Sequence, residues 1–149
     1  MSNVLRRAAM PLALALLALV PPASAQLRTP RVSPDATVKQ TIGITDVTIT
    51  YSRPGVKGRV IWGQLVPYGQ AWRTGANEAT TFTVTDDCTI DGQALPAGKY
   101  SLFTIPTEST WQVVFSRQHD LWGAFAYKPE EDQLRVTVTP KAAEHQEWM

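Results

Sequence analysis

Apolar and polar residues alternate through most of the chain from residue 37 onward. In DVTITYS, residues 46–52, the side chains of Val47, Ile49 and Tyr51 fall on one side of an extended chain and hydroxyl residues on the other. A period of two is typical of a β-strand with one buried face. Related patterns predict antiparallel strands at residues 36–42, 79–85, 88–90, 93–95, 99–105, 111–116 and 134–140.

Turn-forming residues separate these segments. Asp91-Gly92 lies between two short apolar runs and predicts a tight hairpin. Arg53-Pro54-Gly55 ends the strand before it, because proline cannot donate a ladder hydrogen bond. Apart from residues 1–25, no apolar repeat of about 3.6 residues occurs. We therefore predict one all-β domain over residues 37–149, an antiparallel β-sandwich or open barrel of about seven or more short strands.

Residues 1–25 have the composition of a secretory signal peptide. A basic start precedes an apolar run over residues 8–20 and the small-residue ending Ala23-Ser24-Ala25. The apolar run is shorter than the roughly 20 residues that span a bilayer. We expect cleavage near Ala25, a periplasmic or extracellular location, and an extended leader over residues 26–36.

Charge and cysteine content narrow the range of partners. The chain has 14 basic and 13 acidic residues, and without Arg6 and Arg7 of the signal peptide 12 basic residues remain, a net charge of −1. Nucleic-acid-binding domains are usually strongly basic, so we do not expect DNA or RNA as a partner. Cys88 is the single cysteine, which excludes a disulfide within the chain. We interpret it as a small buried hydrophobe.

Residues 51–80, hereafter the block, interrupt the strand pattern and concentrate basic and aromatic side chains. No acidic residue occurs between Asp46 and Glu78. A long irregular segment in a compact domain is uncommon unless it is functional or folded on itself. We expect the block to pack over one end of the sheets and to form a ligand-binding surface. The candidate ligand contacts, with one tryptophan from a later loop, are Arg53, Lys57, Trp62, Trp72, Arg73, Asn77, Glu78 and Trp122.

Three functions are compatible with this composition. The first is a binding module for a small polar or anionic ligand such as a carbohydrate or peptide, because arginines bind anions and aromatic clefts bind small ligands. The second is a hydrolase that uses Glu78 as general acid or base. The third is a structural envelope protein, in which the tryptophans are core mass and Arg73 pairs with Glu78 in a salt bridge.

Other chemistry has little support in the sequence. His119 and His145 have no partner at a metal-ligand spacing, and no G-x-S-x-G motif is present. We therefore predict no metal site, no cofactor and no catalytic residue, and we favour a binding protein over an enzyme.

Several long motifs occur in a fixed order. They are YSRPGVKGRVIWGQLVPYGQAWRTGANEATTFTVT at residues 51–85, LPAGKYSLFTIP at residues 95–106 and WGAF at residues 122–125. Over residues 33–140 the chain resembles the bacterial domain-of-unknown-function family 2911. The resemblance implies an exported β-rich protein without established activity, substrate or cofactor. Members of that family usually continue with further strands after a segment similar to Glu147-Trp148, so we expect this chain to be C-terminally short.

Overall fold

The computed structural model of the chain describes residues 29–149, so the predicted signal peptide lies outside the described residues. Within this part of the chain there is no helix that is long and apolar enough to cross a membrane. A short 3-10 turn, η2 (Pro129–Glu131), precedes the last strand. Residues 29–149 form eight strands: β1 (Asp35–Ile42), β2 (Thr45–Ser52), β3 (Thr81–Val84), β4 (Cys88–Ile90), β5 (Gln93–Leu95), β6 (Gly98–Pro106), β7 (Trp111–Ser116) and β8 (Asp132–Val138).

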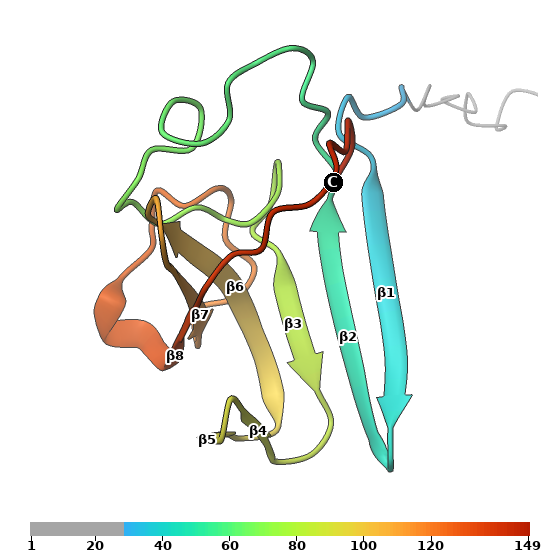
Figure 1. Cartoon of the computed structure of the whole chain (residues 1–149). Helices are drawn as coiled ribbons and strands as arrows, with labels where there is room; N and C mark the ends of the chain where they lie inside the picture. The colour runs from blue at the N-terminus through green and yellow to red at the C-terminus, as the bar shows by residue number, and fades with distance from the viewer. Residues whose placement is uncertain (1–28) are drawn as a thin grey trace, which may run out of the picture.

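Six of these strands form one antiparallel sheet in the order β1-β2-β3-β6-β7-β8, and β4 and β5 form a separate hairpin (Figure 1). The registers follow the alternation in the sequence, with Val47 opposite Val84 and Ile49 opposite Phe82. The Asp91-Gly92 turn joins β4 to β5, and both of its residues have positive φ, as a tight hairpin turn requires. The prediction of an antiparallel all-β domain is confirmed.

One face of the large sheet carries the main core, and the β4-β5 hairpin packs against it. Phe82, Tyr100 and Phe115 meet edge to face on this side, with ring centroids 5.1 and 6.5 Å apart for the two contacts of Phe115. Leu95 of the hairpin is fully buried against them. Cys88, also in the hairpin, is half-buried and packs on the same cluster.

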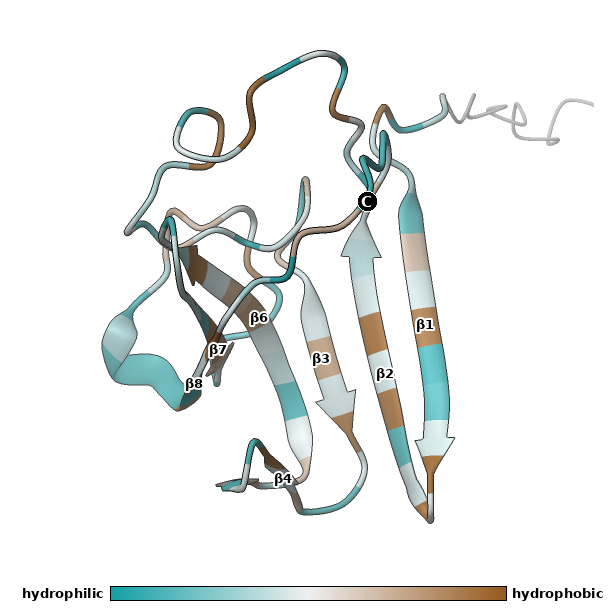
Figure 2. Cartoon of the chain, in the orientation of Figure 1, coloured by the Kyte–Doolittle hydropathy of each residue, from teal (hydrophilic) through white to brown (hydrophobic). Residues whose placement is uncertain are grey.

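The opposite face has a smaller core at the middle of the sheet. Phe103 of β6 and Val114 of β7 are fully buried there, beneath the loop between β7 and η2. The amide of Ala79 donates to the carbonyl oxygen of Leu121 at 2.9 Å and fixes this loop to the block. Strand β6 is therefore buried on both faces, and Figure 2 shows apolar residues on it and on β7.

The block continues the sheet beside the end of β6. Strand β3 is too short to pair with all of β6, and the block occupies the remaining length. Trp72 exchanges two backbone hydrogen bonds with Thr104, at 2.8 and 2.9 Å, and the amide of Gly69 donates to the carbonyl oxygen of Pro106 at 2.8 Å. The block therefore lies at one end of the sheet, where it loops above the strands in Figure 1.

Two terminal segments reach the same end of the sheet. The leader residues before β1 contact the block, because the amide of Arg53 donates to the carbonyl oxygen of Pro34 at 2.8 Å. Residues 139–149, hereafter the tail, leave the edge strand β8 and cross to the end of β2 (Figure 1). Block, leader and tail thus meet at one end of the domain.

Candidate functional site

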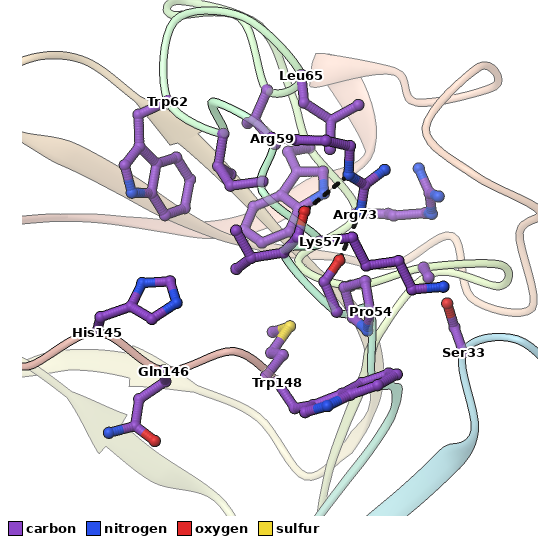
Figure 3. A pocket seen from close by; sticks show the side chains of 18 of the residues that line it. Ser33, Pro54, Lys57, Arg59, Trp62, Leu65, Arg73, His145, Gln146 and Trp148 are labelled. Atoms are coloured by element: carbon purple, nitrogen blue, oxygen red, sulfur yellow. Dashed lines mark hydrogen bonds between the residues drawn. The ribbon is translucent and has the colours of Figure 1, made fainter.

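An open cleft of about 1150 Å³ lies between the block, the leader and the tail (Figure 3). It is bounded on one side by basic side chains, on another by tryptophans and on a third by the tail. The lining residues are Val32, Ser33, residues 54–57, Arg59, Ile61, Trp62, Leu65, Val66, Trp72, Arg73, residues 75–77, residues 141–146, Trp148 and Met149.

The charges that line this cleft are mostly positive. Its basic side chains are those of Lys57, Arg59, Arg73 and Lys141, whereas Glu144 is its single acidic lining residue. Among the ion pairs of residues 29–149, none involves any of these four basic residues. The cleft therefore has an excess of positive charge that the described part of the chain does not neutralise by direct pairing.

Arg59 stabilises the block itself. Its guanidinium donates to the carbonyl oxygen of Gly55 at 2.6 Å and to that of Val56 at 3.0 Å, the bonds drawn as dashed lines in Figure 3. These two bonds close a turn of the block around the arginine side chain. We therefore assign Arg59 a structural role in shaping the basic wall.

Arg73 has a different environment. Its Nε atom is buried and has no hydrogen-bond partner within residues 29–149. Burial lowers the pKa of the Arg73 guanidinium, although an arginine stays protonated in proteins at neutral pH. A buried donor without an acceptor costs about 1–3 kcal/mol. Arg73 thus brings to the lining of the cleft a positive charge, together with a buried donor that has no acceptor within residues 29–149.

The backbone beside Arg73 is held in an unfavourable conformation. Thr74 has a φ of 54°, which is a rare value for a β-branched residue. Its hydroxyl donates to the Thr104 hydroxyl at 3.2 Å, and its carbonyl oxygen accepts from the hydroxyl of Thr80 at 2.8 Å. Strained residues of this kind persist when their surroundings fix them, and they concentrate at functional sites.

Tryptophans form the apolar wall. The Trp62 ring meets that of Trp111 edge to face with centroids 4.5 Å apart, and that of Trp72 at 5.7 Å. Trp62 keeps 43% of its surface exposed, so the cluster is accessible to a ligand. Trp148 of the tail lies over Gly55, within 3.3 Å of the position that a Cβ atom would take there. Aromatic faces of this kind bind planar or apolar parts of ligands.

Asn77 joins three segments at the rim of the cleft. Its side-chain amide donates to the carbonyl oxygen of Ser33 at 3.2 Å, and its main-chain carbonyl oxygen accepts from the backbone amide of Gly123 at 3.1 Å. The φ of Asn77 is 56°, a conformation that asparagine tolerates better than most residues. Asn77 therefore holds the leader and the loop after β7 against the block.

Glu78 lies outside this cleft, in a second and smaller groove of about 470 Å³ that we call the paired groove. Both of its carboxylate oxygens accept from Arg31, at 2.5 and 3.1 Å. The salt bridge between Arg73 and Glu78 that the sequence suggested is not formed, because Arg31 of the leader takes that place. The bonds from Arg31 hold the pKa of Glu78 below its ordinary value, which is unfavourable for a general acid.

The remaining charges of the paired groove are also neutralised internally. Arg31 also pairs with Asp35 at 2.8 Å, and Lys99 pairs with Asp120 at 2.6 Å. The hydroxyl of Ser52 donates to Asp35, and this bond together with that from Arg31 lowers the Asp35 pKa. No basic side chain lining this groove, as far as the structure describes it, is without a carboxylate partner.

The structure thus brings five of the eight predicted contact residues to the cleft: Lys57, Trp62, Trp72, Arg73 and Asn77. Arg53, Glu78 and Trp122 are not among its lining residues. Arg53 donates instead to the main-chain oxygen of Met149 at 2.5 Å. Trp122 is 61% exposed and forms a bridge with Glu78 beside the paired groove.

Sequence reasoning identified neither Trp148 as part of the cleft nor Trp111 as the residue that packs against Trp62 of its apolar wall. Trp111 is the first residue of β7, and the alternation places it on the inward face without indicating that Trp62 of the block packs against it. Trp148 lies near the last residue of the sequence, far from the block along the chain. Its position in an otherwise polar tail was the available signal, because a lone tryptophan in such a segment usually packs on something.

No group of three or more histidine, cysteine, aspartate or glutamate side chains within residues 29–149 is arranged to hold a metal ion. His145 lines the cleft and pairs with Glu147 at 3.5 Å. His119 does not line the cleft, and its ring nitrogen lies 2.6 Å from the Asp120 carboxylate.

The fold places the chain among small β-rich domains, with one antiparallel sheet and a cleft lined by basic and aromatic side chains. The family model described as "Protein of unknown function (DUF2911)" matches residues 33–149, so the chain belongs to this family. Neither the curated proteins nor the solved structures contain a match to the chain.

Proposed function

We propose that the chain is an exported binding module for a small anionic ligand that also carries a stackable body, such as an acidic sugar or an acidic peptide. Export is inferred from residues 1–25 alone. The observation that carries the ligand assignment is Arg73, whose buried Nε has no acceptor within residues 29–149 and which lines the cleft. A guanidinium in this state binds a carboxylate through charge-assisted hydrogen bonds.

The two walls of the cleft define the chemistry of the ligand. Lys57 and Lys141 add positive charge near Arg73, which favours an anionic group over a neutral one. Trp62 and Trp72 offer a partly exposed aromatic surface, which favours a ring or an apolar body next to that group. An inorganic anion would use only the basic wall, so we expect it to bind more weakly than a ligand that contacts both walls.

Matched probes test these two requirements separately. Indole-3-acetate has a carboxylate and an aromatic body, indole-3-acetamide has the same body without the charge, and acetate has the charge without the body. Glucuronate and glucose form a second pair for an acidic sugar. Thermal shift and calorimetry on the full chain measure the binding, because a ligand that binds only the folded state raises its apparent stability.

We expect the charged members of each pair to bind more tightly than the neutral members. Arg73→Ala should weaken binding of the charged probes about tenfold or more, because a hydrogen bond to a charged group contributes about 1.5–3 kcal/mol. Arg31→Ala, a matched arginine substitution in the paired groove, should leave the affinity unchanged. Equal affinity of the wild type and Arg73→Ala for every probe that binds would contradict the proposal.

A further inference from the structure

The tail supplies the third wall of the cleft. Residues 141–146 and Trp148 line it together with the block, so a ligand between the two would contact both. Figure 3 shows His145 and Trp148 on the side opposite the basic side chains of Lys57 and Arg59. Without the tail, the cleft would be an open surface of the block.

This wall is attached to the block by strand-like pairing over its last three residues. The amide of Val56 donates to the main-chain oxygen of Glu147 at 2.8 Å, and the amide of Met149 donates to the carbonyl oxygen of Pro54 at 3.3 Å. Gly55 and Trp148 form an antiparallel bridge between these two bonds. The pairing is the addition of an extended segment to an exposed backbone, a common mode of peptide recognition.

Side chains add specificity to this attachment. The carboxylate of Glu147 accepts from the amide of Lys57 at 2.7 Å, and Lys57 has a positive φ of 52°. Gly55 is buried beneath the ring of Trp148, and a Cβ atom there would lie 3.3 Å from two ring carbons. The absence of a side chain at Gly55 therefore allows the indole to lie flat against the backbone.

The rest of the tail is loosely held. Residues 139–146 are exposed, and within the described residues the backbone hydrogen bonds of the tail to the block begin at Glu147. A segment fixed at its two ends and free between them can separate from the block when the three-residue attachment opens. Local opening of this kind requires little free energy where few buried contacts and hydrogen bonds are lost.

We infer that Trp148 is a specificity-determining ligand contact of the cleft, and that ligand binding and attachment of the tail stabilise each other. This inference rests on the proposed function, because it assigns a further wall to the same site. A ligand seated between Arg73 and the tail contacts Trp148 only when residues 147–149 are attached. A ligand that binds more tightly to the attached state shifts the equilibrium of the tail toward attachment. Attachment of the tail then raises the affinity for the ligand by the same factor.

Amide hydrogen exchange at Val56 and Lys57 reports the attachment directly, because both amides donate to Glu147. Exchange is measured by NMR on the full chain, with and without saturating indole-3-acetate. In the wild type we expect the probe to slow exchange at both amides. In Trp148→Ala we expect faster exchange and about tenfold weaker binding of the probe. In Gly55→Ala, whose Cβ would lie 3.3 Å from two ring carbons, we expect smaller changes in the same direction.

The controls separate this inference from the proposed function. Trp122→Ala removes an exposed tryptophan outside the cleft and should change neither the amide exchange rates nor the affinity for the probe. An unchanged melting temperature shows that each variant is folded. If the wild type binds the probe and Trp148→Ala binds it equally, Trp148 is not a ligand contact and the inference is wrong. Failure of the wild type to bind any probe contradicts the proposed function itself, whatever the exchange rates.

Discussion

The cleft and the paired groove both contain arginines at the same end of the domain, but they differ in how those arginines are satisfied. Arg31 in the groove has two carboxylate partners, Asp35 and Glu78. Arg73 in the cleft has none within residues 29–149, and its Nε is also without any acceptor. The basic side chains of the groove are paired with carboxylates of the protein, whereas Arg73 of the cleft has no such partner within residues 29–149.

This difference is the basis for the proposal that the paired groove has a structural role and the cleft a binding role. Exposed ion pairs such as those of Arg31 tie segments together and contribute little to stability. A buried unpaired donor is unfavourable for the isolated protein, and a basic residue in that state has a rationale when an external anion completes it. Ser52 joins the two regions, since its hydroxyl donates to Asp35 and its carbonyl oxygen accepts from the amide of Ala76.

The largest expected effect on stability is at Gly75, where the backbone of the cleft packs directly on Ser52. A Cβ atom at Gly75 would lie 3.1 Å from both the carbonyl oxygen of Ser52 and the hydroxyl of Thr80. We expect Gly75→Val to lower the free energy of unfolding by about 1–3 kcal/mol, because overpacking forces backbone shifts. Chemical denaturation measures this change, and a variant as stable as the wild type would show that the cleft backbone is not rigid.

A carboxylate introduced into the cleft should make it resemble the paired groove. Asn77→Asp places an acidic group among the basic lining residues, and aspartate tolerates the positive φ of this position. We expect about tenfold weaker binding of indole-3-acetate by calorimetry, since the added charge repels the anion and competes for Arg73. Asn77→Gly is the control, because it also loses the bond to Ser33 but adds no charge. Equal affinity of the two variants would contradict an electrostatic basis for binding.

The smallest effect concerns the pH dependence of stability, which the paired groove should influence. The bonds from Arg31 lower the pKa of Glu78 from its ordinary value of 4.5. A carboxyl group with a depressed pKa in the folded state stabilises the protein above its unfolded pKa, and this contribution is lost as the pH falls. Glu78→Gln should therefore flatten the decrease in melting temperature below about pH 4.5, with a small change at neutral pH because the pair is exposed. An unaltered acid profile would mean that the pair does not form in solution.

The strands were predictable from the sequence because each is encoded locally. Alternation in residues 46–52 and the Asp91-Gly92 turn require only neighbouring residues to be interpreted, and they appear as β2 and the β4-β5 hairpin. The block was recognised for a similar reason, since it interrupts the alternation. The prediction that it packs over one end of the sheets agrees with its pairing to the end of β6, whereas the ligand-binding surface predicted for it stays a prediction.

The partners of the site residues were not predictable in the same way. Glu78 is four residues beyond the Thr74 turn and close to Arg73 in sequence, yet its partner Arg31 lies 47 residues away in the leader. The turns at Thr74 and Asn77, both with positive φ, direct successive side chains to different sides of the block. Trp148 joins the cleft through backbone pairing of the tail with Gly55, a contact that no local pattern encodes.

The central claim is that the Arg73 guanidinium receives the anion, and NMR of the arginine Nε–H groups tests it most directly. The Arg73 signal, assigned by its disappearance in Arg73→Lys, is followed during titration with indole-3-acetate, with the Arg31 signal as the internal control. We predict that the Arg73 signal shifts in a saturable manner and that the Arg31 signal stays in place. A titration that saturates elsewhere in the spectrum while the Arg73 signal does not move would contradict the account.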